Sequence, residues 1–124
     1  MNTMPAMKTM PEVLEEAFQA FNTRDLPRLR TTLHVQGVWP DTLGTGGDVV
    51  GIEAVMAHFA QLFAMARPDI QLIQVLETTP DSVTVEAQYL VEDPQGNVWS
   101  DTRATLIYHL REGLLSGMTI VSGF

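Results

Sequence analysis

The sequence predicts a single α+β domain in which helices come first and an antiparallel sheet follows. Before Pro68, apolar residues recur at helical spacing; from Asp69 to Phe124 they alternate with the two-residue period of strands. Turns and not helices separate the strands of this second part, so neighbouring strands must pair antiparallel. A chain of 124 residues is long enough for such a domain to bury its core without a metal or a disulfide.

Two helices are expected near the start of the chain. Thr9-Met10-Pro11-Glu12 has the form of a capping box and predicts a first helix that ends at Asn22-Thr23-Arg24. Its apolar stripe contains Leu14, Ala17, Phe18 and Phe21. Asp25 is expected to cap a shorter second helix with Pro27 in its first turn. Residues 1–8 are predicted to be a disordered leader, and residues 9–124 to form the single domain.

A short strand and a third helix complete the first part. The strand is expected from Val35 to Trp39, and Pro40-Asp41 followed by several glycines predicts a flexible loop. This loop is not interpreted as a phosphate loop, because no GKS or GKT follows it. Gly51 is expected to open a helix that ends at Arg67-Pro68 and buries a wide apolar stripe: Ile52, Val55, Met56, Phe59 and Phe63.

Four strands are predicted after Pro68, and both faces of their sheet carry apolar residues. The third of them, Val98 to Leu110, places Ala104, Leu106 and Tyr108 on one face and Trp99, Asp101, Arg103, Thr105, Ile107 and His109 on the other. Three helices cover one face only. We therefore expect a second copy of the chain on the other, which gives a homodimer through the outer sheet face.

Composition limits the possible partners. Fifteen acidic against seven basic residues give a formal net charge of −8, which disfavours nucleic acid and anionic membranes. No apolar run has the ~20 residues of a spanning helix, and the chain start lacks the features of a secretion signal. The absence of cysteine fits the cytoplasm, which is the expected location. The three histidines are too dispersed for a metal motif, so no metal and no cofactor are expected.

The order of elements resembles the nuclear transport factor 2-like superfamily, in particular its SnoaL-like and ketosteroid-isomerase-like branches. The resemblance covers about residues 10–124 and rests on Asp25-Leu26, Trp39-Pro40-Asp41, the Gly-led helix at Gly51 to Val55, and the Glu112-Gly113 turn before the last strand. It implies a cone in which a strongly curved sheet wraps three helices and leaves an apolar pocket open at one end, commonly in a dimer.

The resemblance also suggests a catalytic carboxylate. In isomerase-like members a general base follows the first strand, and Asp41 matches that position within one residue. Trp39 and Pro40 beside it would partly desolvate the carboxylate, which makes it a stronger base. The alternative is that Asp41 caps the turn into the glycine-rich loop. The family's oxyanion Tyr aligns with Ala17 and its protonated Asp with Thr105 or Leu106, so steroid isomerisation itself is not expected.

Other polar residues have two possible roles. Asp101 and Arg103 share a strand face and resemble, in reversed order, the Arg-x-Asp arrangement of limonene-epoxide-hydrolase-like proteins. If that face is outward, they form an ordinary surface salt bridge or a dimer contact, and His109 on the same face becomes a surface or interface residue. His58 lies at the edge of an apolar helix stripe, either as a packing residue or as a second catalytic group.

The sequence thus predicts a SnoaL-like pocket protein for a small apolar organic ligand, with possible acid–base catalysis of an isomerase, cyclase or hydrolase type. The expected catalytic residues are Asp41, His58 and Arg103. The expected pocket residues are Phe18, Trp39, Phe59, Phe63, Tyr89 and Asp101. The alternative is a ligand-binding or dimeric association module of the same fold without catalysis.

Overall fold

The computed structural model describes residues 10–41 and 47–123. In chain order the elements are α1 (Glu12–Asn22), α2 (Leu26–Arg30), β1 (Leu33–Pro40), β2 (Asp48–Val50), α3 (Ile52–Met65), β3 (Arg67–Thr79), β4 (Ser82–Glu92), β5 (Val98–Arg111) and β6 (Leu114–Ser122). The predicted leader, residues 1–8, lies outside the described residues. The capping-box prediction is wrong, because α1 begins after Pro11 as its N-cap and has no side-chain cap there. Helices followed by a sheet confirm the predicted α+β class.

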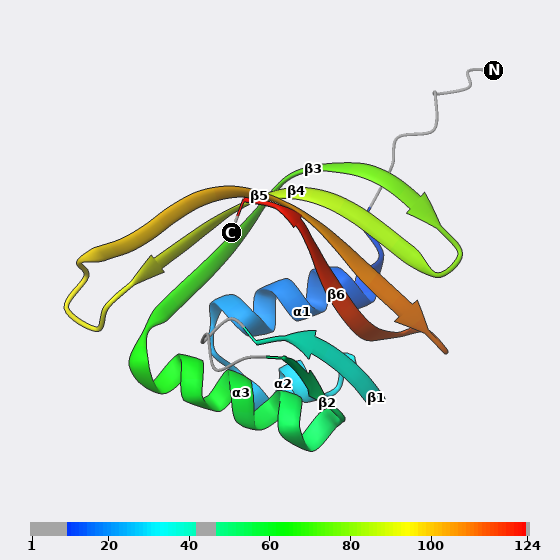
Figure 1. Cartoon of the computed structure of the whole chain (residues 1–124), viewed down its shortest axis with the longest axis horizontal. Coiled ribbons are helices and arrows are strands. Elements are labelled where there is room, and N and C mark those ends of the chain that lie inside the picture. Colours follow the sequence, from blue (N-terminus) through cyan, green and yellow to red (C-terminus); the bar gives the residue numbers. More distant parts are fainter. Residues whose placement is uncertain (1–9, 42–46, 124) are drawn as a thin grey trace.

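One six-stranded sheet, in the order β2-β1-β6-β5-β4-β3, curves over the helices (Figure 1). Strands β3 to β6 pair antiparallel with their chain neighbours, as predicted. Strand β1 joins β6 in parallel and β2 antiparallel. The sheet arches above α1, with α3 on the same concave side. The cone implied by the sequence resemblance is therefore confirmed.

Strand β2 was not anticipated, because the glycines before it predict only a loop. Its short ladder pairs Trp39 with Val49 and Pro40 with Asp48, and thereby orients the end of β1. At the parallel join, a Cβ on Gly117 would lie 2.8 Å from the Val38 carbonyl oxygen, closer than real Cβ atoms approach backbone. Glycine at this position therefore lets β6 lie against β1, the strand that leads to Asp41.

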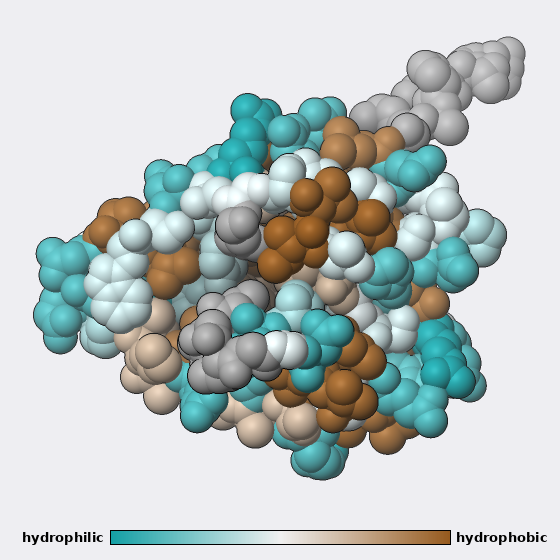
Figure 2. All heavy atoms as spheres, viewed as in Figure 1, coloured by the Kyte–Doolittle hydropathy of each residue, from teal (hydrophilic) through white to brown (hydrophobic). Residues whose placement is uncertain are grey.

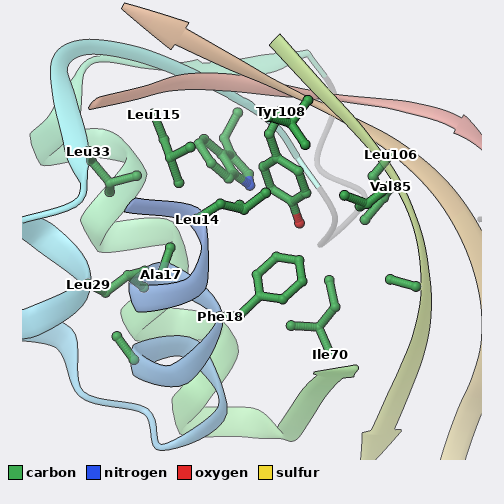
Figure 3. Packing of buried hydrophobic residues seen from close by; sticks show 14 of the residues in the cluster. Leu14, Ala17, Phe18, Leu29, Leu33, Ile70, Val85, Leu106, Tyr108 and Leu115 are labelled. Atoms are coloured by element: carbon green, nitrogen blue, oxygen red, sulfur yellow. The ribbon is translucent and has the colours of Figure 1, made fainter. Parts of the chain in front are cut away.

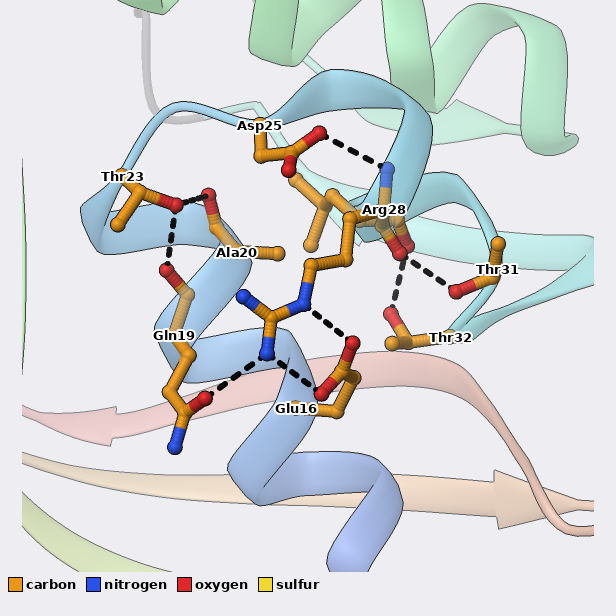
Figure 4. Close-up of polar contacts among 9 residues, drawn as sticks. Glu16, Gln19, Ala20, Thr23, Asp25, Arg28, Thr31 and Thr32 are labelled. Carbon is orange, nitrogen blue, oxygen red and sulfur yellow. Dashed lines mark hydrogen bonds and ion pairs between the residues drawn. The ribbon is translucent and has the colours of Figure 1, made fainter.

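A polar clamp fixes α1 against α2 (Figure 4). As predicted, the Asp25 side chain caps α2, where Oδ1 accepts the Arg28 backbone N–H at 3.2 Å. The Arg28 guanidinium reaches back to α1, donating to Glu16 Oε1 at 2.7 Å and to Gln19 Oε1 at 2.8 Å. This hydrogen bonding holds the pKa of the Glu16 carboxyl below its usual range. The clamp fixes the helix that contributes Phe18 to the core.

The inner face of the sheet supplies most of the core (Figure 3). Alternate residues of β4 and β5 are buried there: Val83, Val85, Ala87, Ala104, Leu106 and Tyr108. They pack against Leu14, Ala17 and Phe18 of α1 and against Val55 and Phe59 of α3. The structure thus assigns the even-numbered residues of β5 after Asp101 to the inner face, an orientation that the sequence left open.

The outer face carries polar pairs at its centre, and Trp99 of β5, which was expected on this face, is exposed. At its centre, Arg103 Nε lies 2.9 Å from Glu86 Oε2 and Gln88 donates to Asp101 Oδ1 at 2.6 Å. His109 Nε2 lies 2.8 Å from the Thr119 hydroxyl. Polar side chains pair across strands here because solvent is available to them. The homodimer through this face stays a prediction, and light scattering of the protein in solution would measure its mass.

Candidate functional site

A cavity of about 60 Å³ lies among the helices and the inner face of the sheet and is partly open to solvent. Aromatic rings from different elements form much of its wall: Phe18 and Phe21 of α1, Trp39 of β1, Phe59 of α3, Tyr89 of β4 and Tyr108 of β5. In the view of Figure 2, apolar residues also gather beneath the arch of the sheet, between hydrophilic neighbours. The curvature of the sheet and its helical cover together create this apolar space.

The aromatic wall is held by edge-to-face contacts. Phe18 meets the Tyr108 ring at a centroid distance of 5.6 Å, and Trp39 meets Phe59 at the same distance. Trp39 also lies 6.2 Å from Tyr108. Such pairs contribute about 0.5–1.5 kcal/mol each beyond simple burial. The rings therefore stabilise one another and give the cavity a defined shape.

The polar atoms of this wall belong to phenol and indole groups. Burial raises the pKa of Tyr89 to about 12. Burial also raises the pKa of Tyr108, with a further upward effect from Tyr89 nearby. Both phenols consequently keep their protons at neutral pH and can donate hydrogen bonds. The cavity is apolar in its walls and carries hydrogen-bond donors.

Asp41 and His58, both expected as catalytic residues, come together at the end of β1. His58 Nδ1 lies 3.8 Å from Asp41 Oδ1, and the two side chains are only 5% and 6% exposed, respectively. Asp41 follows the strand that ends at Pro40, and His58 lies on the buried stripe of α3. Packing of α3 against β1 brings a carboxylate and an imidazole from distant parts of the chain to ion-pair distance.

The electrostatics of this pair favour a neutral imidazole. Burial lowers the pKa of His58, and the Asp41 carboxylate opposes this effect only in part. His58 is therefore uncharged at neutral pH. An uncharged imidazole adds no positive charge beside the Asp41 carboxylate.

Asp41 and His58 are each close in the sequence to a residue that lines the cavity. Trp39 precedes Asp41 by two residues, Phe59 follows His58 directly, and the His58 and Phe59 rings are 5.9 Å apart. Asp41 and His58 are not themselves among the described residues that line the cavity. The structure thus places the His58 ring next to Phe59 of the aromatic wall.

The remaining predicted site residues fall into two groups. Phe18, Trp39, Phe59 and Tyr89 line the cavity, as the sequence interpretation requires of pocket residues. Phe63 is outside the described lining and instead stacks on Phe59 at 6.2 Å. Arg103 and Asp101 lie on the exposed outer face and bind Glu86 and Gln88, so the structure does not bring them to Asp41. Asp101 and Arg103 therefore adopt the outward arrangement, in which they make surface contacts and do not line the pocket.

Sequence reasoning did not select Tyr108 as a site residue. A usable signal was present, because Tyr108 alternates with Ala104 and Leu106 on one face of its strand. A phenol on an otherwise apolar strand face needs either a partner for its hydroxyl or a space to point into. The cavity provides that space.

The curved sheet over three helices, with an aromatic cavity on its concave side, defines the nuclear transport factor 2-like class of α+β proteins. The chain matches the SnoaL-like domain over residues 14–118 and belongs to that family. A comparison with curated proteins gave no significant match.

Solved structures with the same fold agree with this assignment. A Δ5-3-ketosteroid isomerase from Mycobacterium sp. has a TM-score of 0.79 at 14% identity, with 90% of each chain covered. A Mycobacterium tuberculosis protein in complex with estradiol-17beta-hemisuccinate has a TM-score of 0.78 at 18% identity, covering 90% of this chain and 91% of that one. A putative polyketide cyclase from Sinorhizobium meliloti has a TM-score of 0.75 at 18% identity, covering 90% and 94%. At these identities the likeness shows the fold.

Two further properties concern only residues 10–41 and 47–123. Within these ranges, no three His, Asp or Glu side chains gather closely enough to hold a metal ion. No helix there has the length and apolar character needed to cross a membrane.

Proposed function

We propose that this protein binds a small, largely apolar organic molecule in the cavity and catalyses a proton transfer on it, with the Asp41 carboxylate as the base. The observation that carries the proposal is the buried pair of Asp41 and His58, 3.8 Å apart, beside the aromatic wall. An apolar cavity with a few polar groups near it is the usual form of a small-molecule site. A buried carboxylate whose imidazole partner contacts the aromatic wall is a candidate general base.

The proposed reaction begins with a hydrogen on the carbon next to a carbonyl group. Asp41 takes this proton, the C–H bond breaks, and its electron pair moves to the carbonyl oxygen as an enolate. The proton then returns to another position, or the enolate attacks a second carbonyl carbon, whose C=O π bond breaks and whose oxygen takes the proton from Asp41. Isomerases and cyclases share this first step. His58 acts as a positioning residue, because its uncharged ring faces Asp41 Oδ1 without neutralising the carboxylate.

The related structures support this class of ligand. Their names include a ketosteroid isomerase, a putative polyketide cyclase and a complex with an estradiol derivative. The cavity of about 60 Å³ is nevertheless smaller than an engineered apolar cavity of ~150 Å³ that binds benzene. We therefore propose a ligand much smaller than a steroid, or one that enters with one end and leaves the other outside.

One observation favours a second candidate function, ligand binding without catalysis. The described lining contains phenols and an indole, but neither Asp41 nor His58. In this alternative the pair of Asp41 and His58 has a structural role and fixes α3 to the end of β1. The two candidates differ in whether the bound molecule exchanges protons with the protein.

Exchange of carbon-bound hydrogen separates the two. Cyclopentanone is incubated with the protein in D₂O, and loss of its α-hydrogen signal is followed by ¹H NMR. For catalysis we expect saturable exchange above the buffer rate, with Asp41→Asn at least about a hundredfold slower. Glu86→Gln removes a carboxylate from the outer face and is the matched control.

Chemical denaturation of each variant shows whether its fold is retained. An exchange rate that is unchanged in a folded Asp41→Asn protein contradicts the role of Asp41. Binding of cyclopentanone without any exchange supports the alternative function.

A further inference from the structure

We infer that the Tyr108 hydroxyl is the hydrogen-bond donor that binds the carbonyl oxygen of a neutral ketone or quinone in the cavity. The inference rests on the proposed function, since it assigns a specific contact within the same cavity. It concerns recognition of the ligand and does not depend on whether Asp41 transfers a proton.

The geometry of Tyr108 supports this role. Its side chain is on the inner face of β5, is 5% exposed and contributes to the cavity wall. Figure 3 shows its hydroxyl pointing into the space between Phe18, Ile70 and Leu106. The ring is fixed by Phe18 at 5.6 Å and by Trp39 at 6.2 Å. The phenol is thus held in one orientation without a ligand.

The hydroxyl has no acceptor among residues 10–41 and 47–123. No hydrogen bond among these residues involves it. Every polar side-chain atom that is sealed from water in the described part of the chain does have a partner. The Tyr108 oxygen must therefore be reached from the cavity. A donor left unpaired in an apolar site is unfavourable, and a ligand acceptor would remove this cost.

The environment determines which acceptor fits. Burial raises the pKa of Tyr108, so the group remains a donor at neutral pH. The described lining contains no Lys or Arg to compensate a bound anion, and an uncompensated carboxylate or phenolate is costly to bury. A carbonyl oxygen is neutral, compact and accepts hydrogen bonds. The phenol and its apolar surroundings therefore match a ketone or a quinone.

Two isosteric probes test the contact. Cyclopentanone carries the acceptor, and methylenecyclopentane replaces its oxygen by a CH₂ group. Their dissociation constants are measured by NMR titration for the wild type, for Tyr108→Phe and for Tyr89→Phe, which removes the other phenol of the cavity. We expect the wild type to prefer the ketone, and Tyr108→Phe to reduce that preference by about two- to tenfold.

Infrared spectroscopy of the bound ketone gives a second readout. The carbonyl stretching frequency should be lower in the wild type than in Tyr108→Phe, because a donated hydrogen bond weakens the C=O bond. Tyr89→Phe should keep both the preference and the lower frequency.

The outcomes separate the inference from the proposed function. If the wild type and Tyr108→Phe show the same preference between the two probes, Tyr108 is not the donor. Binding of the probes would still support the ligand cavity. If the preference for the ketone is lost in Tyr89→Phe and kept in Tyr108→Phe, the donor is Tyr89 and the inference about Tyr108 is wrong. If neither probe binds the folded wild type, the ligand cavity fails, and the inference fails with it. Ketone binding without proton exchange leaves the inference supported and only the catalytic proposal refuted.

Discussion

The two faces of strand β5 differ in burial and in the contacts of their side chains, although their residues alternate along the chain. On the inner face, Leu106 and Tyr108 are buried against the helices. On the outer face, Arg103 contacts Glu86, and His109 contacts Thr119, in the presence of solvent. Position along the strand therefore says little about the role of a side chain. The face decides whether a polar group is a surface contact or a donor in an apolar cavity.

Protonation behaviour follows the same division. Inside, loss of solvent raises the pKa values of Tyr89 and Tyr108 and lowers that of His58. Outside, the pKa of Glu86 is lowered mainly by a hydrogen bond from Gln74, with a contribution from Arg103. Burial thus favours the uncharged forms on the inner side, whereas partners favour the charged forms on the outer side.

The largest expected effect tests the inner face. Leu106→Ala removes a side chain that is 1% exposed and should lower the free energy of unfolding by about 2–5 kcal/mol. The adjacent Thr105→Ala, whose side chain points to the outer face, should cost far less. Urea denaturation of both variants measures the difference. Equal losses in the two variants would show that the faces are not energetically distinct.

A smaller effect is expected in the pH dependence of stability. The unfolded chain gives His58 its ordinary pKa of about 6.5, and burial lowers the pKa in the folded state. Above pH 6.5 the ring is neutral in both states and its contribution to stability is fully present. As the pH falls below 6.5, the unfolded chain takes up the proton first, so stability decreases until the lower folded pKa is reached.

His58→Gln should remove this slope, and His109→Gln on the outer face should retain it. Denaturation midpoints between pH 7 and pH 5 provide the measurement. Carboxyl groups such as Glu112, whose pKa a hydrogen bond from His34 lowers from 4.5, act at more acidic pH. The same slope in wild type and His58→Gln would mean that His58 is not the responsible group.

The smallest effect is expected for Arg103→Ala. Arg103 is largely exposed and contacts Glu86 on the outer face, where solvent and salt screen the interaction. We expect a urea midpoint and a rate of cyclopentanone exchange that are indistinguishable from those of the wild type. A clear loss of exchange in a folded Arg103→Ala protein would instead restore Arg103 to the catalytic group predicted from sequence.

Local chemistry allowed much of the fold to be predicted from the sequence. The Asp25 cap, the Gly51 helix start and the alternation after Pro68 each act over a few residues, and each is confirmed. The third helix ends at Met65 and β3 starts at Arg67, slightly earlier than expected. The parallel join of β1 to β6 connects distant segments, and no local pattern specifies it.

The site was predictable only in part, for the same reason. The sequence indicated Asp41 and His58 as candidate catalytic residues. The distance of 3.8 Å between their side chains depends on how α3 packs against β1, which no local pattern predicts. Alternation divided β5 into two faces and left open which one is buried, because both carry apolar residues. Arg103 was therefore assigned to the site and Tyr108 was not, although only Tyr108 lines the cavity.

The location of a bound ketone shows directly whether the inner face of the sheet is the binding face. Intermolecular NOEs between cyclopentanone and the assigned side chains of the wild-type protein report which face the ligand contacts. We predict NOEs from the ligand to the rings of Phe18 and Tyr108 on the inner face, and none to Thr105 or Ile107. NOEs confined to these outer-face residues, with no contact to the aromatic wall, would show that the ligand does not bind in the cavity.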